Sequence, residues 1–363
     1  MKRRQFLKAG GVGLAATTIA APAIAQTAPT LSWRMTCSWP KSLDTLFGGA
    51  EYLARRIAEM TDNKFQIRVF AAGEIVPALQ VLDAVQNGTV EMGHTASYYY
   101  VGKDPTFTFD ATVPFGMNFR AMNSWQRQGG GQALINEFFA GYNVLPMPAG
   151  NTGTQAGGWY RKEIKTVEDL KGLKFRIGGW GGAVLTKLGV VPQQLGGGDI
   201  YPALEKGTID AAEWVGPYDD EKLGFYKVAK YYYAPGWWEG QTNLSLYVNL
   251  DSWKQLPKAY QSIVQVAAAD ANTWVLGKYD ADNPAALKRL IAGGTELRYF
   301  SRPVMEACFK ASRELYAEES ARNPKFKKIF DPWSSYLAVE DEWFRVEEQQ
   351  FDNFMYGQLG KKA

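Results

Sequence analysis

An arginine at the end of a predicted strand, followed by a run of glycines, is well suited to bind an anion. Lys174-Phe175-Arg176-Ile177 alternates polar and apolar residues, which predicts a strand, and a glycine loop at 178–182 then opens a helix at 183–189. Arginine offers a planar fork of donors, and a helix start offers free N–H groups and partial positive charge. Arg176 is therefore a candidate carboxylate receiver. The alternative is a surface strand residue before an ordinary glycine turn.

Residues that serve in nucleophilic catalysis or bind transition metals are few. His94 is the one histidine, and Cys37 and Cys308 are the two cysteines. This composition argues against a His/Cys zinc site, a Cys–His dyad and a Ser-His-Asp triad. We interpret His94 as structural. The two cysteines either form one long-range disulfide or remain buried thiols.

Aromatic residues gather in short clusters, which form either core or the walls of a small-molecule pocket. The clusters are Trp33/Trp39, Tyr98 to Tyr100, Tyr231 to Tyr233 and Trp237-Trp238. If residues 98–100 continue a strand, alternation divides the three tyrosines between its two faces, so two of them pack in the core.

The N-terminus has the layout of a bacterial Tat export signal. A twin arginine, Arg3-Arg4, precedes a small-residue apolar stretch at 9–21 and the cleavage pattern Ala23-Ile24-Ala25. We expect residues 1–25 to be removed rather than kept as an anchor, and the mature protein to be soluble and periplasmic. The leader carries four basic residues and no acidic one, so without it the formal charge falls from +3 to −1. Nothing in the mature sequence then indicates nucleic-acid binding.

The elements that must position these groups begin with a β-α-β-α-β pattern, which predicts a parallel sheet. The expected elements are a strand at 31–36, a helix at 42–61 capped by Ser42 or Asp44, a strand at 65–70, a helix at 77–86 and a strand at 89–92.

An internal echo predicts two similar lobes. The segment 84–91 resembles 203–210, and both read as a helix end, a glycine cap and a strand. Ligands of parallel sheets bind beyond the carboxyl ends of the strands. The residues that follow the two copies, His94 to Tyr100 and Glu213-Trp214, should therefore face each other across a cleft.

The fold class expected from these patterns is α/β, with two lobes, parallel-rich mixed sheets and a ligand cleft between them. Lobe one comprises residues 26–152 with a return segment at 243–290, and lobe two comprises residues 153–242. The return segment holds a strand at 243–249 and helices at 253–274 and 282–291. Residues 291–363 form helices at 303–322 and 339–359, and the apolar face of the last packs on the lobes or on a partner chain.

Several runs, taken in order, resemble one known family. They are the signal peptide, VEDLKGLKFRIGG around Arg176, YPALEKGTIDAAEW ending at Trp214, and the aromatic stretch before NLSLYVNLDSWKQLP. Together they resemble the periplasmic solute-binding subunit of tripartite ATP-independent periplasmic (TRAP) transporters, over nearly the whole mature chain. The chain is most similar to the branch that binds 2-oxo or 2-hydroxy monocarboxylates, such as pyruvate and lactate, together with a sodium or calcium cation.

The resemblance implies how such a protein works. Two α/β lobes, joined by crossover strands and a long helix, close over the ligand and deliver it to a membrane permease pair driven by an ion gradient. It implies no catalysis and no organic cofactor. Arg176 takes the place of the carboxylate clamp, Asn151 and Tyr99 should hydrogen-bond the ligand oxygens, and Gln155 lies at the same ligand site.

The cation ligands implied by the resemblance are Gln155, Glu213, the backbone carbonyl of Trp214, and Glu239. A hard cation prefers carboxylate and carbonyl oxygens, and a 2-oxo acid can chelate it through a carboxylate oxygen and the keto oxygen. From its residue type alone, Glu213 could instead be a strand-end carboxylate paired with a lysine.

Two other functions compete with solute binding of this kind. A Tat-exported periplasmic enzyme with a bound cofactor is one, although no G-x-G-x-x-G follows the first strand and no cysteine set could hold an iron–sulfur cluster. A sugar-binding protein is the other, because of the aromatic clusters, and its binding would not depend on Arg176.

Overall fold

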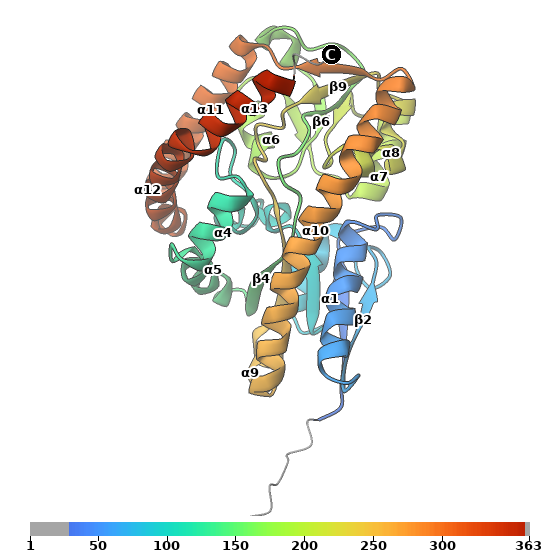
Figure 1. Ribbon diagram of the computed structural model, residues 1–363, viewed down its shortest axis with the longest axis vertical. Helices are drawn as coiled ribbons and strands as arrows, with labels where there is room; N and C mark the ends of the chain where they lie inside the picture. The colour runs from blue at the N-terminus through green and yellow to red at the C-terminus, as the bar shows by residue number, and fades with distance from the viewer. Residues whose placement is uncertain (1–28, 360–363) are drawn as a thin grey trace, which may run out of the picture.

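The computed structural model describes residues 29–359 and contains two β-sheets, one in each of two lobes (Figure 1). The predicted leader, residues 1–25, lies outside the described residues. The first sheet has the order β2-β1-β3-β10-β4. Its strands are β1 (Leu31–Cys37), β2 (Phe65–Phe70), β3 (Met92–Thr95), β4 (Val144–Asn151) and β10 (Asn243–Asn249). The predicted return strand is confirmed, since β10 pairs antiparallel with both β3 and β4.

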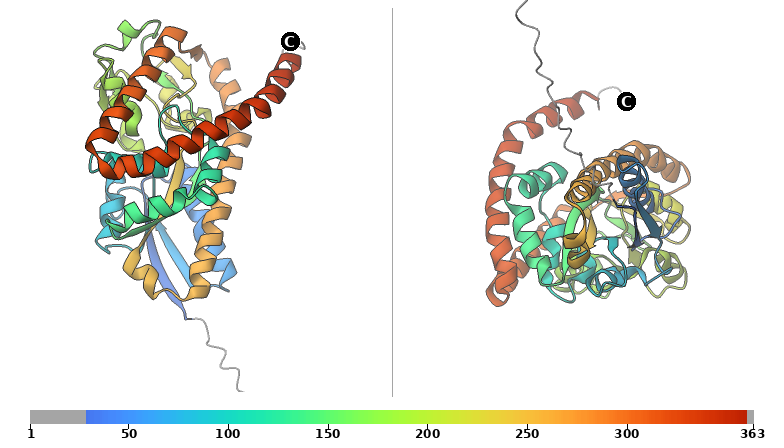
Figure 2. Two further views of the ribbon diagram at one scale, coloured as in Figure 1. Left: turned by 90° about the vertical axis from the view of Figure 1, so that its left-hand side faces the viewer. Right: turned by 90° about the horizontal axis from the view of Figure 1, so that it is seen from below.

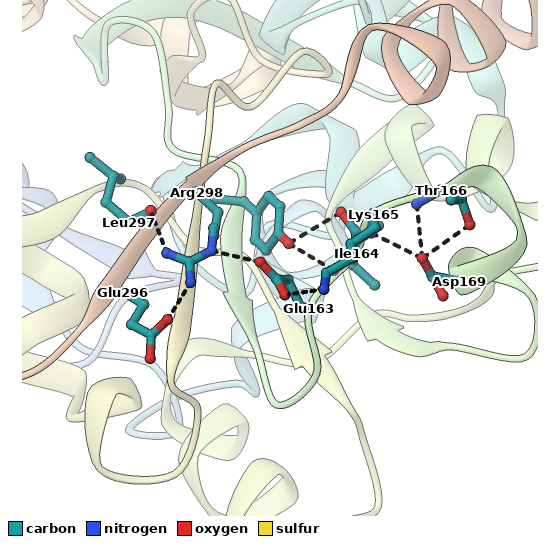
Figure 3. A network of polar contacts seen from close by, with 9 residues as sticks. Glu163, Ile164, Lys165, Thr166, Asp169, Glu296, Leu297 and Arg298 are labelled. Carbon is teal, nitrogen blue, oxygen red and sulfur yellow. Dashed lines mark hydrogen bonds and ion pairs between the residues drawn. The ribbon is translucent and has the colours of Figure 1, made fainter.

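The second sheet has the order β11-β9-β5-β8-β6-β7. Its strands are β5 (Gly158–Tyr160), β6 (Lys174–Arg176), β7 (Val191–Gln193), β8 (Ala211–Ala212), β9 (Tyr231–Ala234) and β11 (Glu296–Tyr299). The segment 291–363 was expected to be helical, and β11 is the part of it that differs. Arg298 of β11 donates to Glu163 at 2.7 Å, which ties this edge strand to the loop after β5 (Figure 3).

Helices cover both sheets and link them. They are α1 (Leu46–Met60), α2 (Val81–Gln86), α3 (Thr108–Ala111), α4 (Phe119–Arg127), α5 (Gly131–Ala140), α6 (Gly179–Thr186), α7 (Gly197–Glu205), α8 (Pro217–Leu223), α9 (Leu250–Gln255), α10 (Lys258–Ala292), α11 (Arg302–Arg322), α12 (Pro324–Val346) and α13 (Glu348–Leu359). Among the residues described, no helix is long and apolar enough to cross a membrane.

One helix, α10, runs along both lobes, packing on α1 and β4 in the first and on α8 in the second (Figure 1). The residue pattern predicted two helices here, and that prediction was wrong. The helix continues past Gly277 and Pro284 because fully buried side chains hold it on both lobes. Val275 lies against Gly49 of the first lobe, and Tyr279 donates to Asp219 of the second. Burial of these side chains outweighs the weak helix preference of glycine and proline.

The C-terminal helix predicted at 339–359 is in fact divided, because α12 ends at Val346 and α13 begins at Glu348. Apart from Phe344, which is partly buried against the core, most of its apolar residues are exposed. Their exposed fractions run from 38% to 69%, for Val339, Trp343, Val346, Phe351, Phe354, Met355, Tyr356 and Leu359. Figure 2 shows α13 extending away from the body of the molecule.

Three further local predictions differ from the structure. Helix α1 begins at Leu46 with Thr45 as its N-cap, so neither Ser42 nor Asp44 caps it. Residues 97–100 form a 3₁₀ turn rather than a strand, so Tyr98, Tyr99 and Tyr100 are all buried instead of alternating. Helix α6 starts at Gly179, so most of the predicted glycine loop is helical.

The predicted internal echo is present in both lobes. Gly88 and Gly207 each follow a helix with φ of +70° and +71°. After them the amide of Thr89 donates to Ala84 O at 2.9 Å, and that of Thr208 donates to Ala203 O at 3.0 Å. One copy leads into β3 and the other into β8, so the repeated unit places the strand ends of both sheets.

Both cysteines are free, buried thiols, so of the two alternatives left by the sequence the structure shows buried thiols and not a disulfide. His94 is fully buried in β3, as its structural interpretation requires.

Both cap glycines should resist substitution by alanine. A side chain in the left-handed region is strained, so Gly88→Ala and Gly207→Ala should each lower the free energy of unfolding by about 1 kcal/mol, measured by urea denaturation. Gly277→Ala is the matched control, since Gly277 lies within α10 with nothing within 4 Å of an added Cβ. The control should be neutral or stabilising. If Gly88→Ala and Gly207→Ala were as stable as the control, the assignment of these two glycines as strained helix caps would be contradicted.

Candidate functional site

Arg176 and Glu213 meet at the carboxyl ends of two adjacent parallel strands. Strands β6 and β8 pair in parallel, and the Glu213 amide continues the ladder with a bond to Arg176 O at 3.0 Å. Arg176 Nη1 donates to the carbonyl of Glu213 at 2.6 Å and also to Glu213 Oε1, while Nε donates to Leu195 O at 3.1 Å. Both side chains are buried. The alternative of a Glu213–lysine pair is thereby excluded.

The N-terminus of α6 holds the same carboxylate. The amide of Gly178, the N-cap of α6, donates to Glu213 Oε1 at 2.8 Å. A Cβ on Gly178 would lie 2.7 Å from the Tyr98 ring, and one on Gly181 would lie 2.7 Å from Trp238 Cβ. The glycines are therefore required for close packing of these aromatic rings, in addition to forming a helix start.

A second carboxylate, Glu239, is brought to this pair by the crossover segments. Residues 152–157 and 235–242 run side by side, with the Thr152 amide bonded to Thr242 O at 3.2 Å and the Gln155 amide bonded to Glu239 O at 3.1 Å. Gln155 Nε2 donates to the hydroxyls of Thr152 and Thr242 at 3.1 and 3.2 Å. Gln155 and Glu239 are both buried.

The electrostatics of the site are unbalanced. Burial raises the pKa of Glu213, although the charge of Arg176 opposes the shift. Burial, and then the charge of Glu213, raise the pKa of Glu239 well above its usual range. One guanidinium therefore faces two buried carboxylates, which leaves an excess negative charge when both are ionised. A buried charge without a partner is costly, so the site favours a proton or a cation.

Polar atoms without partners indicate what the site can bind. At this site, four buried oxygens accept no hydrogen bond from the described residues: Glu213 Oε2, both carboxylate oxygens of Glu239, and Gln155 Oε1. Buried polar groups are almost always satisfied, so such a group of acceptors is unusual. Carboxylate and amide oxygens are the ligands that sodium and calcium prefer, so these residues fit a hard cation.

Donors without partners lie beside these acceptors. Over the described part of the chain, Arg176 Nη2 and Trp214 Nε1 make no hydrogen bond, although both are buried. The Arg176 guanidinium lies over the Trp214 ring at 5.0 Å from its centroid. Free N–H groups on a cationic side chain suit a carboxylate ligand.

Tyr99 approaches the site from the first lobe. Burial raises its pKa to about 12, and the nearby charge of Arg176 opposes the rise. Gln194 of the second lobe donates to Tyr99 O at 2.7 Å. Gln194 follows β7, and the charge of Glu213, which follows β8, also raises the Tyr99 pKa. The segment after β3 therefore lies close to the segments after both β7 and β8.

The Asn151 amide group is engaged within the protein. Its Nδ2 donates to Gln241 Oε1 and, at 2.8 Å, to Asn243 Oδ1, and its Oδ1 accepts from the Gly153 amide at 2.9 Å. These bonds join β4 to β10 where the chain crosses between lobes. Its predicted contact with ligand oxygens would require one of these bonds to be exchanged.

Trp238 neighbours the site, although the sequence placed it only in an aromatic cluster of core or pocket wall and not among the site residues. Its side chain packs on Gly181 and its indole lies beside Glu213. Its position next to Glu239 in the sequence was the available signal.

The lobes also touch beside the site. Helix α8 begins three residues after Trp214, and its Asp219 accepts from the Thr45 hydroxyl of the first lobe at 2.6 Å and from Tyr279 of α10 at 2.8 Å. Burial raises the pKa of Asp219 to about 6. The α1 N-cap residue therefore contacts the second lobe instead of its own helix.

The buried charge excess predicts the effect of Glu239→Gln on the cation-free protein. A carboxyl whose folded pKa is raised stabilises the fold below its unfolded pKa, and this contribution is lost as pH rises through the folded pKa. In chelator, Glu239→Gln should therefore raise the free energy of unfolding by about 1 kcal/mol or more at about pH 7, and by less at about pH 4. Urea denaturation at both pH values measures the difference.

The matched control is Glu168→Gln, an exposed side chain that should change stability little at either pH. A Glu239→Gln protein that is less stable than wild type at about pH 7 would show that the carboxylate is compensated within the chain.

Comparison with known proteins places this geometry in a family. Residues 37–323 match the model of the bacterial extracellular solute-binding proteins, family 7 (DctP). A monocarboxylate 2-oxoacid-binding periplasmic protein of Nostoc sp. is 51% identical over 360 residues, which cover 98% of this chain and 99% of that protein.

Two solved structures are similar in both sequence and fold. The first is a TRAP transporter solute-binding protein from Bordetella bronchiseptica, with a TM-score of 0.91 and 52% identity over 92% of this chain and 100% of that chain. It is a mixed-occupancy dimer, with copurified calcium and picolinate bound in one active site and an apo site. A TRAP periplasmic solute-binding protein from Pseudoalteromonas atlantica with bound sodium and pyruvate has a TM-score of 0.87 and 39% identity over 89% of this chain and 99% of that one. The chain therefore belongs to the bacterial extracellular solute-binding protein family 7, the periplasmic solute-binding proteins of TRAP transporters.

Proposed function

We propose that this protein captures a small 2-oxo or 2-hydroxy monocarboxylate, such as pyruvate, another 2-oxo acid or lactate, together with a sodium or calcium cation. The observation that carries the proposal is the sealed group of Arg176, Glu213 and Glu239, in which acceptors without partners lie beside donors without partners. The relatives support it, because one is named for 2-oxoacids and two hold a cation with a carboxylate.

Charge counting explains why the anion needs a cation. The two carboxylates and the guanidinium together carry an excess of one negative charge, and a monocarboxylate adds another. A cation at Glu213, Glu239, the Gln155 amide oxygen and the Trp214 carbonyl would remove this excess and could be chelated by the ligand's carboxylate and keto oxygens. Picolinate and pyruvate both place a second donor atom next to a carboxylate, as such chelation requires.

The protein's own groups hold the anion from the other side. Arg176 Nη2 is available for the carboxylate, while Nη1 and Nε are engaged with Glu213 and Leu195, which fix the orientation of the guanidinium. Tyr99 and Asn151 are proposed as further hydrogen-bond partners. Burial strengthens these charge-assisted bonds only where the pairing is good.

We propose that the protein binds its ligand without catalysing a reaction and then delivers it to the TRAP membrane permease. Lobe one is assigned to 26–152 and 243–290 and lobe two to 153–242, because the crossover segments at 152–157 and 235–242 join the two sheets. No observation on the described residues favours the cofactor-bound enzyme or the sugar-binding alternative over this proposal.

The test is a calorimetric titration of the mature protein with pyruvate, 2-oxobutyrate, branched 2-oxo acids, lactate, succinate and neutral sugars, in sodium, in calcium and in chelator. Unfolding and refolding first remove any copurified ligand. We expect binding of 2-oxo or 2-hydroxy monocarboxylates that depends on the cation. Binding that is unchanged in chelator without sodium would remove Glu213 and Glu239 as cation ligands, and binding of none of the acids would reject the proposal.

Arg176→Lys should weaken monocarboxylate binding at least about tenfold, because lysine keeps the charge but loses the two-donor fork. Lysine is preferable to alanine here, since Arg176→Ala leaves the buried Glu213 carboxylate unpaired and should also destabilise the fold. Glu213→Gln should weaken binding and reduce its dependence on the cation. Arg313→Lys, at an exposed position on α11, is the control and should bind as wild type does. If Arg176→Lys bound the ligand with wild-type affinity, the proposed role of Arg176 in binding the ligand carboxylate would be rejected.

We also propose that the exposed apolar face of α12 and α13 binds a second copy of this chain. Exposed apolar residues occur on both helices, α13 extends beyond the body (Figure 2), and the Bordetella bronchiseptica relative is a dimer. Exposed apolar surface of this extent commonly marks a protein interface.

Sedimentation of the mature protein tests this interface. Wild type should sediment as a dimer. The double variant Phe351→Ser, Phe354→Ser should sediment as a monomer that keeps its ligand affinity, because both residues lie on α13, which extends away from the body (Figure 2). Val266→Ser, at an exposed apolar position on α10, is the control and should remain dimeric. A monomeric wild type would contradict the proposal.

A further inference from the structure

The histidine of the first lobe is bonded to a tryptophan that reaches the cleft. Trp39 Nε1 donates to His94 Nδ1 at 2.7 Å. Because Nδ1 accepts this bond, Nε2 carries the proton and can donate to Ala149 O at 3.2 Å. Burial lowers the pKa of His94 to about 4, which keeps the ring neutral and its Nδ1 lone pair available. The tautomer of His94 is therefore fixed from both sides.

The position of Trp39 follows from the first sheet. Strand β1 ends at Cys37, which pairs with His94 on β3, so Trp39 lies just beyond the carboxyl end of β1. That edge of a parallel sheet is where ligand-contacting residues gather. Trp39 and His94 are both buried.

The Trp39 ring contacts the aromatic partners of Arg176. It lies 6.2 Å from the Tyr99 ring, centroid to centroid, and 6.5 Å from the Trp214 ring, which it meets edge-on at 80°. Trp214 belongs to the second lobe and carries the Arg176 guanidinium over its ring. Trp39 is thus an aromatic contact between the two lobes, beside the proposed ligand site.

We propose that Trp39 and His94 are positioning residues for ligand binding. His94 fixes the orientation of the Trp39 indole, and the indole in turn supports Tyr99 and Trp214 when the lobes are together. This inference rests on the proposed function, because it concerns the same site. It gives the single histidine of the chain a role that does not depend on contact with the ligand or the cation.

The geometry also explains why other buried residues would not substitute for this pair. Tryptophan has one donor at the end of a rigid ring, and histidine offers one acceptor and one donor at fixed angles. Loss of the His94 acceptor leaves the Trp39 N–H buried without a partner, which favours rotation of the ring out of its place.

A double-mutant cycle on the full mature chain tests the inference, with pyruvate affinity in calcium measured by calorimetry. His94→Leu should weaken binding about five- to tenfold, and His94→Asn, which keeps an acceptor near the position of Nδ1, should restore most of the affinity. Trp39→Phe should weaken binding to a similar extent. In the Trp39→Phe background, His94→Leu should cause no further loss, because its effect passes through the indole.

The NMR signal of the Trp39 indole N–H, assigned by its absence in Trp39→Phe, gives a second measurement. It should shift in His94→Leu and stay near its wild-type position in His94→Asn. Trp125→Phe is the matched control, a fully buried tryptophan of the first lobe against Gly131, and should bind pyruvate as wild type does.

Two results would overturn the inference. One is an unchanged affinity in His94→Leu while the indole signal moves. The other is an equal loss of affinity on His94→Leu in the wild-type and Trp39→Phe backgrounds. If His94→Leu does not fold, wild-type affinity in Trp39→Phe would overturn it as well. A wild type that binds none of the acids would reject the proposed function together with this inference, whereas additive effects in a protein that binds pyruvate would reject this inference alone.

Discussion

The rest of the structure depends on a buried ion pair whose charges do not balance. Arg176 and Glu213 are sealed together at adjacent strand ends, and Glu239 is placed against them with no second cation from the described residues. A buried ion pair alone would be weak evidence for a binding site, because such pairs also occur in ordinary protein cores. With the extra carboxylate, the buried group gains stability when a proton or a cation is added, and Arg176 Nη2 still has N–H groups without a partner.

The fold assembles this group from five separate parts of the chain. Strands β6 and β8 supply the arginine and the first glutamate, and the two crossover segments supply Gln155 and Glu239. The 3₁₀ turn after β3 brings Tyr99 from the first lobe. Because every contributor lies at a strand end or a crossover, a change in the angle between the lobes would disturb the donors and acceptors together, as expected of a protein that releases its ligand by opening.

Much of this could be predicted from the sequence. Periodicity gave the strands at 31–36 and 65–70 and the return strand at 243–249, and the glycine echo gave the repeated unit of the two lobes. The residue pattern failed at α10, at the tyrosine turn and at β11. At α10, packing against both lobes overrides local glycine and proline preferences. Strand β11 is stabilised by pairing with β9, which lies about sixty residues earlier in the chain.

Residue types and their order determined the class of chemistry by themselves: an arginine after a strand, acidic residues at strand ends and no set of histidines or cysteines. Resemblance to a family supplied the roles. Only the tertiary structure decided which polar atoms are already satisfied, and it showed the Asn151 amide engaged and Glu239 without a partner. It also decided that His94 meets Trp39. Hydrogen-bond partners distant in sequence depend on how the sheets pack in three dimensions, and local pattern carries no record of that packing.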